Sequence, residues 1–438
     1  MRKVDAWVGL PMCLLLDGWR KLWSLFRTSD SSQSAPGRRG ILFVKLAEQG
    51  STVLAYPALQ RAVEMVGREN VYFLVFEQNR FILDAMEVIP PENVVSIPAD
   101  GIWSTMVQTL KAVFRLRRMK LDAAIDLEFF ARSSAILSYL SGATRRVGLH
   151  AFAGGGPWRG HLMTHPVLYN PHFHTAQVFL GQVEALDQPA GRLPAVDLVP
   201  RPLGDLPRGR YQPDAEVQER ARSILQEVCG QSDVPRLVLL NANCSDLLPL
   251  RKWDEPNYVA LARRLLDALP DLHIAFTGAP AEAPKVAGLV QEIDSPRCHS
   301  LAGKTTIREL LAIYGLSSVL VTNDSGPAHF ATLTPIHIVT LFGPETPALF
   351  RGLSEGTRIL WAGTACSPCV SAYNNRVSTC RDNVCMQRIS VDQVFATITG
   401  ILHEQEASPW QVLVPKSRVE QPSAIEWKEP KPAGEADS

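Results

Sequence analysis

The sequence predicts an α/β protein with two domains, each built on a parallel β-sheet that helices cover on both faces. Apolar runs of strand length alternate with amphipathic segments of helical spacing along residues 41–141. The same alternation restarts after a stretch rich in Pro, Gly and Arg at 191–213, and the length of 438 residues suits two or three domains. We therefore expect two Rossmann-like domains, residues 40–205 and 232–403, that face each other across a cleft.

The composition narrows the class of protein. Apolar residues make up 46% and charged residues 20% of the chain, and 44 basic residues balance 44 acidic ones. These values are typical of a globular protein and exclude a disordered or fibrous chain. A protein that binds nucleic acid normally carries a basic excess, so we expect no nucleic-acid partner. Because no apolar stretch reaches 18 residues, a conventional membrane span is not expected.

Residues 1–39 predict a helix at a membrane interface followed by a linker. Seven basic and three acidic residues accompany a stripe of Leu15, Trp19, Leu22 and Phe26 at helical spacing. A basic amphipathic helix with tryptophans is typical of an element that lies at the surface of a bilayer. Two alternatives stay open: a helix packed on the protein's own surface, and a secretory signal. The segment Ser29–Gly37 is predicted to be a flexible linker.

The middle of the chain supplies the two sheets. In the first half, apolar runs predict strands at 41–46, 71–76 and 123–127, and helical spacing predicts helices at 51–66, 103–119 and 133–141. In the second half, strands are predicted at 236–241, 272–277, 317–323 and 336–342, and helices at 256–269, 281–293 and 306–314. Residues 404–438 are rich in Pro, Glu, Lys and Ser and predict a solvated tail.

The strongest candidate for a binding site follows the strand at 317–323. There the chain reads Asp324, Ser325 and Gly326 and then enters a helix that carries His329. Ligands of open parallel sheets bind beyond the carboxyl ends of the strands, and the free N–H groups of a helix start suit a phosphate. The same residues also make a well-capped helix without any ligand, and spacing alone leaves both interpretations open.

Two further loops follow neighbouring strands. Gly343 opens the Gly/Pro-rich loop FGPETP after the strand at 336–342. Arg251 and Lys252 follow the first strand of the second half, where they could neutralise a diphosphate. A solvated loop with an exposed basic pair is the alternative for the latter segment.

These segments together resemble glycosyltransferase family nine, the lipopolysaccharide heptosyltransferase family. The resemblance is carried by ILFVKLAEQGSTVLAYPAL at 41–59, RKW at 251–253, TNDSGPAHFA at 322–331 and LFGPETP at 341–347, and it runs from about residue 41 to 403. It implies a GT-B fold and a metal-independent, inverting transfer from a nucleotide-sugar, with ADP-heptose as the donor of this family. It also implies a lipopolysaccharide-core or other lipid-linked acceptor.

The resemblance also assigns donor-site roles to residues of the second domain. Asp324, Ser325, Gly326 and His329 would line the donor site, and Arg251 would touch the donor phosphates. Glu282 falls near a family acidic residue that binds the nucleoside.

One departure concerns the general base. Where the family has an Asp after the glycine of the first strand–helix loop, this chain has Ser51 after Gly50. A serine hydroxyl cannot take up a proton unaided at neutral pH. We expect Glu48 on the same loop to replace it, with Glu128 second and Asp126 third. The alternatives are a protein that binds nucleotide-sugars without turnover and a GT-B-like nucleotide-sugar epimerase.

Four of the eight cysteines cluster, at Cys366, Cys369, Cys380 and Cys385. Thiolates at these spacings could close a structural zinc site, and plain thiols are the alternative. A disulfide is not expected in the cytosol, an iron–sulfur cluster has no support, and no cofactor is expected for catalysis. The other cysteines are interpreted as isolated small apolar residues: Cys13, Cys229, Cys244 and Cys298.

Five histidines gather between residues 150 and 174 beside a run of three glycines, Gly154 to Gly156. No acidic or cysteine partner has a fixed spacing to them, so we assign them no ligand role. The segment is interpreted as an acceptor-side loop, with His174 and Thr175 opening the next helix.

Overall fold

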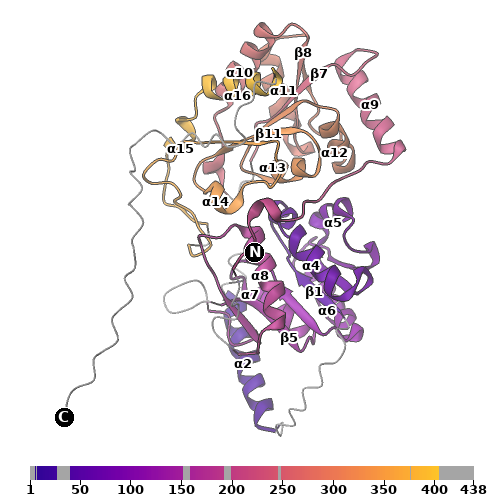
Figure 1. The fold of residues 1–438 in the computed structure, drawn as a ribbon, viewed down its shortest axis with the longest axis vertical. Coiled ribbons are helices and arrows are strands. Elements are labelled where there is room, and N and C mark those ends of the chain that lie inside the picture. The colour runs from indigo at the N-terminus through magenta and orange to yellow at the C-terminus, as the bar shows by residue number, and fades with distance from the viewer. Residues whose placement is uncertain are drawn as a thin grey trace, which may run out of the picture.

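The computed structural model describes residues 5, 7–26, 40–150, 158–191, 199–244, 248–374 and 376–403. The predicted linker Ser29–Gly37, the glycine run 154–156 and the predicted tail 404–438 lie outside these residues. Two domains stack on each other in Figure 1, the N-terminal one in indigo to magenta and the C-terminal one in magenta to yellow.

The N-terminal domain contains a six-stranded sheet in which all neighbouring strands are parallel. Its strands are β1 (Ile41–Val44), β2 (Val71–Phe76), β3 (Val94–Ile97), β4 (Ala123–Asp126), β5 (Arg145–His150) and β6 (His165–Leu168). Its helices are α2 (Gly9–Phe26), α3 (Gln49–Val53), α4 (Tyr56–Val66), α5 (Arg80–Met86), α6 (Ile102–Met119), α7 (Arg132–Leu140) and α8 (Thr175–Glu184).

The C-terminal domain repeats this plan with a second six-stranded parallel sheet. Its strands are β7 (Arg236–Asn241), β8 (Leu272–Phe276), β9 (Cys298–Ser300), β10 (Val319–Asn323), β11 (His337–Phe342) and β12 (Thr357–Trp361). Its helices are α9 (Ala215–Cys229), α10 (Glu255–Ala268), α11 (Ala283–Ile293), α12 (Ile307–Gly315), α13 (Gly326–Phe330), α14 (Pro347–Phe350), α15 (Val384–Gln387) and α16 (Val391–Leu402).

Both sheets have the Rossmann strand order. The orders are β3-β2-β1-β4-β5-β6 and β12-β11-β10-β7-β8-β9, so in each sheet the direction of winding reverses between the first and the fourth strand of the domain. A crevice for a ligand forms outside the carboxyl ends of the strands at this switch point. The topology therefore directs attention to the residues that follow β1, β4, β7 and β10.

Some elements differ from the prediction. The helix expected at 51–66 is divided into α3 and α4, because Pro57 lies in the first turn of α4 and cannot continue a preceding helix. Strand β5 ends at His150, the first residue of the segment interpreted as an acceptor-side loop, and β6 falls inside that segment. The first begins with two arginines and the second contains Pro166, which an edge strand tolerates. His174 is the N-cap of α8, as expected.

Helix α9 packs on α12 and β9, so the structure of the C-terminal domain begins at Ala215 rather than at residue 232. Its core contains Trp253, whose indole N–H donates to the carbonyl of Ile389 at 2.8 Å. This bond ties the loop after β7 to the chain segment before α16.

Helix α2 packs on α7 with one face and exposes the other. Cys13 and Asp17 are buried, whereas Leu15, Trp19 and Leu22 are 69%, 55% and 49% exposed. The helix is thus attached to the protein and still presents an apolar stripe to the outside, at the end of the N-terminal domain that is far from the C-terminal domain (Figure 1). Among the described residues, the structure has no helix both long and apolar enough to cross a bilayer.

Replacing Thr306 by alanine is expected to lower the free energy of unfolding of the C-terminal domain by about 1 kcal/mol. The Thr306 hydroxyl accepts the backbone N–H of Glu309, and the Glu309 carboxylate accepts the backbone N–H of Thr306, which caps α12. Urea unfolding measures the change. Thr397→Ala is the matched control, since Thr397 lies inside α16 and bonds only a helix carbonyl. An equal loss in both variants would contradict the capping role.

Candidate active site

In each domain, polar side chains follow the first and the fourth strand along the chain, and these side chains meet between the domains. Lys45 and Glu48 follow β1, and Glu128 follows β4. Arg251 lies on the loop after β7, and Asp324 comes directly after β10. The two switch points therefore face each other, and the loop of α3 contacts α13 across the interface.

On the C-terminal side, two arginines and two carboxylates lie together. Arg251 Nη1 is 3.7 Å from Asp324 Oδ2 and 4.0 Å from Glu345 Oε2. Arg376 Nε is 3.1 Å from Glu345 Oε1. Both carboxylate side chains are only 3% exposed, so water screens these charges little.

The N-terminal side continues this arrangement. Glu48 Oε1 is 2.5 Å from Arg376 Nη1 and therefore joins the two domains. Glu48 Oε2 lies 3.9 Å from the fully buried Lys45 Nζ, which in turn lies 3.7 Å from Glu128 Oε2. Opposite charges thus alternate across the interface. We call this set the interdomain ion network: Lys45, Glu48, Glu128, Arg251, Asp324, Glu345 and Arg376.

The network shifts the pKa values of its carboxyl groups in opposite directions. Burial raises the pKa of Glu48, but Arg376 and then Lys45 outweigh it and hold that pKa at about 2. Burial, followed by the nearby Glu345, raises the pKa of Asp324 to about 8. Burial also raises the pKa of Glu128, although Lys45 opposes the shift. Glu48 is consequently ionised at neutral pH, whereas Asp324 holds a proton.

The stability of the donor-free protein should depend on this shift. Between the ordinary pKa of 3.8 and a pKa of about 8, the folded protein keeps a proton on Asp324 that the unfolded chain has released. The free energy of unfolding therefore falls as the pH rises through this window and levels off above it. We expect Asp324→Asn to remove the fall in urea unfolding measured from pH 4 to 9. Asp392→Asn, at an exposed position of α16, should leave it intact.

His329 adds a neutral imidazole to the site. It is buried, and burial lowers its pKa to about 3. Within the described part of the chain, five buried atoms of the site make no hydrogen bond: Lys45 Nζ, Arg251 Nε, Asp324 Oδ2, His329 Nδ1 and Glu345 Oε1. Unpaired buried polar atoms are costly, so their collection at a strand edge points to a ligand that would pair them.

Gly50 permits the close approach of the two domains. A Cβ atom at this position would lie 2.5 Å from His329 Cδ2, which is closer than atoms can pack. The adjacent Ser51 hydroxyl donates to the backbone carbonyl of Glu48 at 3.0 Å and lies 3.3 Å from its carboxylate. The serine therefore supports the loop that carries Glu48.

Other predicted donor-site residues lie outside the network. Lys252 forms an ion pair with Glu255, and the Glu282 carboxylate accepts the backbone N–H of Ala279 at 2.7 Å. Ser325 donates to the carbonyl of Asn323. Gly326 begins α13, and a Cβ atom at Gly343 would collide with Met386 Sδ at 2.4 Å.

Asp126, the third candidate base, is fully buried and forms an ion pair with Arg159 at 2.5 Å. Burial raises its pKa, with Arg159 opposing the shift. Its backbone carbonyl also accepts the side-chain amide of Gln182. These contacts fix the position of β4 in the N-terminal domain.

Three members of the network were absent from the sequence-based prediction: Lys45, Glu345 and Arg376. Glu345 lies in the FGPETP loop, where its position after a strand was the available signal, whereas Lys45 lay inside the strand predicted at 41–46 and follows β1 only in the structure. Arg376 comes from the cysteine-rich segment, where no periodicity or strand end marks it.

Burial raises the pKa of Cys385 to about 11, and the charges of Cys369, Cys366 and Cys380 act in the same direction. In the described ranges, however, no three of these sulfurs come within the 4.8 Å expected of metal ligands. A group that does so contains Cys229, His273 and His299, all in the C-terminal domain. The sequence had indicated that Cys229 is isolated. In the structure it is not, because α9 ends beside the histidines of β8 and β9.

Two facing Rossmann-type domains with a charged site at their opposed switch points define the GT-B fold, the architecture of a large class of glycosyltransferases. The chain belongs to glycosyltransferase family 9 (heptosyltransferase), whose family model matches residues 110–377.

Individual relatives agree with this assignment. The chain is 25% identical over 167 residues to lipopolysaccharide heptosyltransferase 2 of Salmonella typhimurium. This match covers 37% of this chain and 47% of that protein, so it spans about half of the relative's length. It is 23% identical over 350 residues to lipopolysaccharide heptosyltransferase 1 of Pseudomonas aeruginosa, covering 75% of this chain and 86% of that protein. The solved E. coli ADP-heptose lps heptosyltransferase II superposes with a TM-score of 0.64 at 17% identity, over 84% of this chain and 100% of that chain, and shows the shared fold.

Proposed function

We propose that this protein is an inverting, metal-independent glycosyltransferase that moves a heptose from an ADP-linked donor to a lipopolysaccharide-core or other lipid-linked acceptor. Family membership and the names of the relatives support the sugar, the nucleotide and the acceptor class. The interdomain ion network is the observation that carries the proposal, because it places cations and a candidate base at two opposed switch points.

The donor would be held by the C-terminal side of the network. Arg251 and Arg376 are the cations nearest to Asp324 and Glu345, and a guanidinium matches the geometry of a diphosphate. As the bond between the anomeric carbon and the diphosphate breaks, negative charge grows on the leaving oxygen. Fixed guanidinium groups in a site with little water stabilise that charge without needing a metal ion.

The acceptor hydroxyl would attack the anomeric carbon from the side opposite the diphosphate, which inverts the configuration. We propose that Glu48 takes the hydroxyl proton, since it is the network carboxylate on the acceptor side that is also partly exposed, at 32%. Glu128 is more enclosed and accepts the backbone N–H groups of Leu46 and Ala47 at 2.8 and 2.9 Å. It is better suited to hold Lys45 in place.

A carboxylate with a pKa of about 2 is a weak base. The role of Glu48 therefore requires that Arg376 turn from Glu48 to the donor diphosphate. Loss of this partner would bring the pKa of Glu48 back toward its ordinary value, because Arg376 is the largest of the effects that lower it. Donor binding would thus prepare the base.

We further propose that the protein works on the cytoplasmic face of the inner membrane. The exposed apolar stripe of α2 supports this, because a lipid-linked acceptor lies at a bilayer surface and the stripe offers tryptophan and leucine side chains to it.

Binding of nucleotide-sugars by the full chain tests the proposal. ADP-, UDP-, GDP- and CMP-sugars would be compared by calorimetry, with Asp324→Ala as the variant that removes the carboxyl group at the centre of the site. Selective binding of the ADP-sugar that the variant loses would support the proposal. Selective binding of another nucleotide would change the donor, and binding of none of the four would overturn the proposed transfer from a nucleotide-sugar.

A structural zinc ion at the four clustered cysteines stays a prediction. Metal analysis of the purified protein, compared with Cys369→Ser, tests it. One zinc per chain that the variant loses is the expected result, and equal zinc in both would rule out the site.

A further inference from the structure

Helix α6 exposes an apolar stripe that the sequence analysis did not single out. Trp103, Val107, Leu110 and Phe114 recur at i, i+4, i+7 and i+11 and are 77%, 45%, 51% and 64% exposed. Ile102 before them is 84% exposed. The buried residues of the helix are Ala112, Val113 and Leu116, and they lie on another side. Helix α6 is therefore held by the core through these residues and presents a second, apolar face outward. Exposed apolar surface of this extent marks an interaction site.

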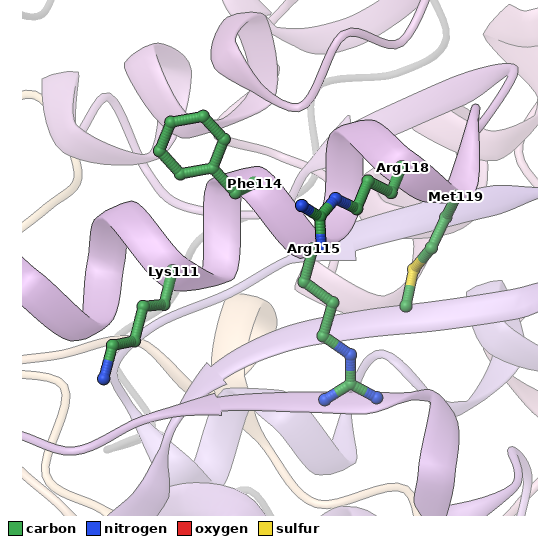
Figure 2. A pocket seen from close by; sticks show the side chains of 5 residues that line it. All are labelled: Lys111, Phe114, Arg115, Arg118 and Met119. Carbon is green, nitrogen blue, oxygen red and sulfur yellow. The ribbon is translucent and has the colours of Figure 1, made fainter.

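A row of cations runs beside the stripe. Lys111, Arg115 and Arg118 follow the spacing i, i+4 and i+7 and, with Phe114 and Met119, line a surface pocket of about 560 Å³ (Figure 2). Helix α6 contains no Asp or Glu, so its cations are not neutralised within the helix. An apolar stripe bordered by cations is complementary to an anionic bilayer, which offers acyl chains and phosphate groups side by side.

The position of α6 relates it to α2. Both helices pack on α7, and Arg117 of α6 approaches the carbonyl of Leu140 at the end of α7. At the other end of α7, the Asp5 carboxylate accepts the backbone N–H groups of Arg132 and Ser133. The N-terminal domain therefore carries two exposed amphipathic helices on a common support.

We propose that α6 is a membrane-docking helix for anionic phospholipid. Its apolar stripe enters the acyl region, and Lys111, Arg115 and Arg118 bind lipid phosphates. The inference deepens the proposed function and rests on it in one respect: docking of the N-terminal domain would bring the acceptor side of the active site to the bilayer that holds a lipid-linked acceptor.

Vesicle flotation of the full chain tests this inference without donor or acceptor. Vesicles of phosphatidylethanolamine with phosphatidylglycerol would be compared with vesicles of phosphatidylcholine alone. We expect Trp103→Ser with Phe114→Ser to weaken partitioning to the anionic vesicles at least about tenfold, because both side chains would otherwise bury apolar surface. Lys111→Gln with Arg118→Gln should weaken it by about fivefold for each charge removed.

Val199→Ser is the matched control, since Val199 is 93% exposed and lies outside α2 and α6. It should partition like the wild type. Unchanged partitioning of both α6 variants would overturn the inference, as would equal binding of the wild type to neutral vesicles. A wild-type dimer in solution that Trp103→Ser dissociates, without vesicle binding, would assign the stripe to a second copy of the chain instead.

The same variants separate this inference from the proposed function. If docking is the only role of α6, they keep nucleotide-sugar affinity and turnover of a detergent-dispersed acceptor. A protein that binds vesicles but no nucleotide-sugar would contradict the proposed function and leave α6 docking intact.

Discussion

Replacing Arg251 by alanine is expected to reduce the affinity for the ADP-sugar by at least about 100-fold. The variant removes a guanidinium that lies 4.0 Å from the almost fully buried Glu345, and the removal of one partner from a buried charge pair typically costs about 2–5 kcal/mol. The diphosphate would lose one of the two network cations on that side and would approach the carboxyl groups with Arg376 alone to offset them. Calorimetric titration with the nucleotide-sugar measures the loss.

Two controls make the result specific to the site. Arg251→Lys keeps the charge but loses the planar fork, so it should recover only part of the affinity. Arg358→Ala removes an arginine of the same domain whose Nε also makes no hydrogen bond among the described residues, yet it lies on β12, at the edge of the sheet. Equal losses from Arg251→Ala and Arg358→Ala would show that general damage to the domain, and not the donor site, is responsible.

Replacing Glu48 by glutamine is expected to lower kcat by about 10²–10⁴, the usual contribution of a general base. The amide keeps the size of the side chain but cannot accept the proton of the acceptor hydroxyl. Donor affinity should not fall, since the substitution frees Arg376 to meet the diphosphate. Initial rates at saturating donor, together with the donor dissociation constant, separate these two effects.

Glu128→Gln and Asp126→Asn are the comparison for this variant. We expect both to lower kcat less than Glu48→Gln does, because Glu128 holds Lys45 and Asp126 holds Arg159 rather than meeting the acceptor. Unchanged turnover in Glu48→Gln and in Glu128→Gln would exclude both residues as the base and leave the mechanism without its proton acceptor.

The alternation of the sequence was enough to predict two parallel α/β domains, because strands buried on both faces appear as continuous apolar runs. The strands of the described chain that the prediction missed lack a long apolar run: β3, β5, β6, β9 and β12. Strand β9 has only three residues, and β5 begins with two arginines. The short helix α3 merged with α4 in the prediction, since only two residues lie between them and Pro57 in the first turn of α4 was the one sign of a break.

The candidate site was predicted as far as strand ends could indicate it. Asp324 and Arg251 each follow a strand, and the structure brings them within 3.7 Å. Arg376 could not be found in this way. It is 328 residues from Glu48 in the sequence, and their contact exists only because the domains stack face to face. Lys252 was predicted from the sequence, because it precedes Trp253 on a predicted donor loop. In the structure it forms an ion pair with Glu255 outside the interdomain ion network.

The pairing of Glu48 with Arg376 also has a kinetic consequence. An acceptor that arrives first would meet a carboxylate too weakly basic to deprotonate it, because the pKa of Glu48 is about 2 while Arg376 remains in place. Only a donor diphosphate would draw the guanidinium away. Substrates would therefore have to bind productively in a fixed order, with the nucleotide-sugar first, and water reaching an empty site would not be activated.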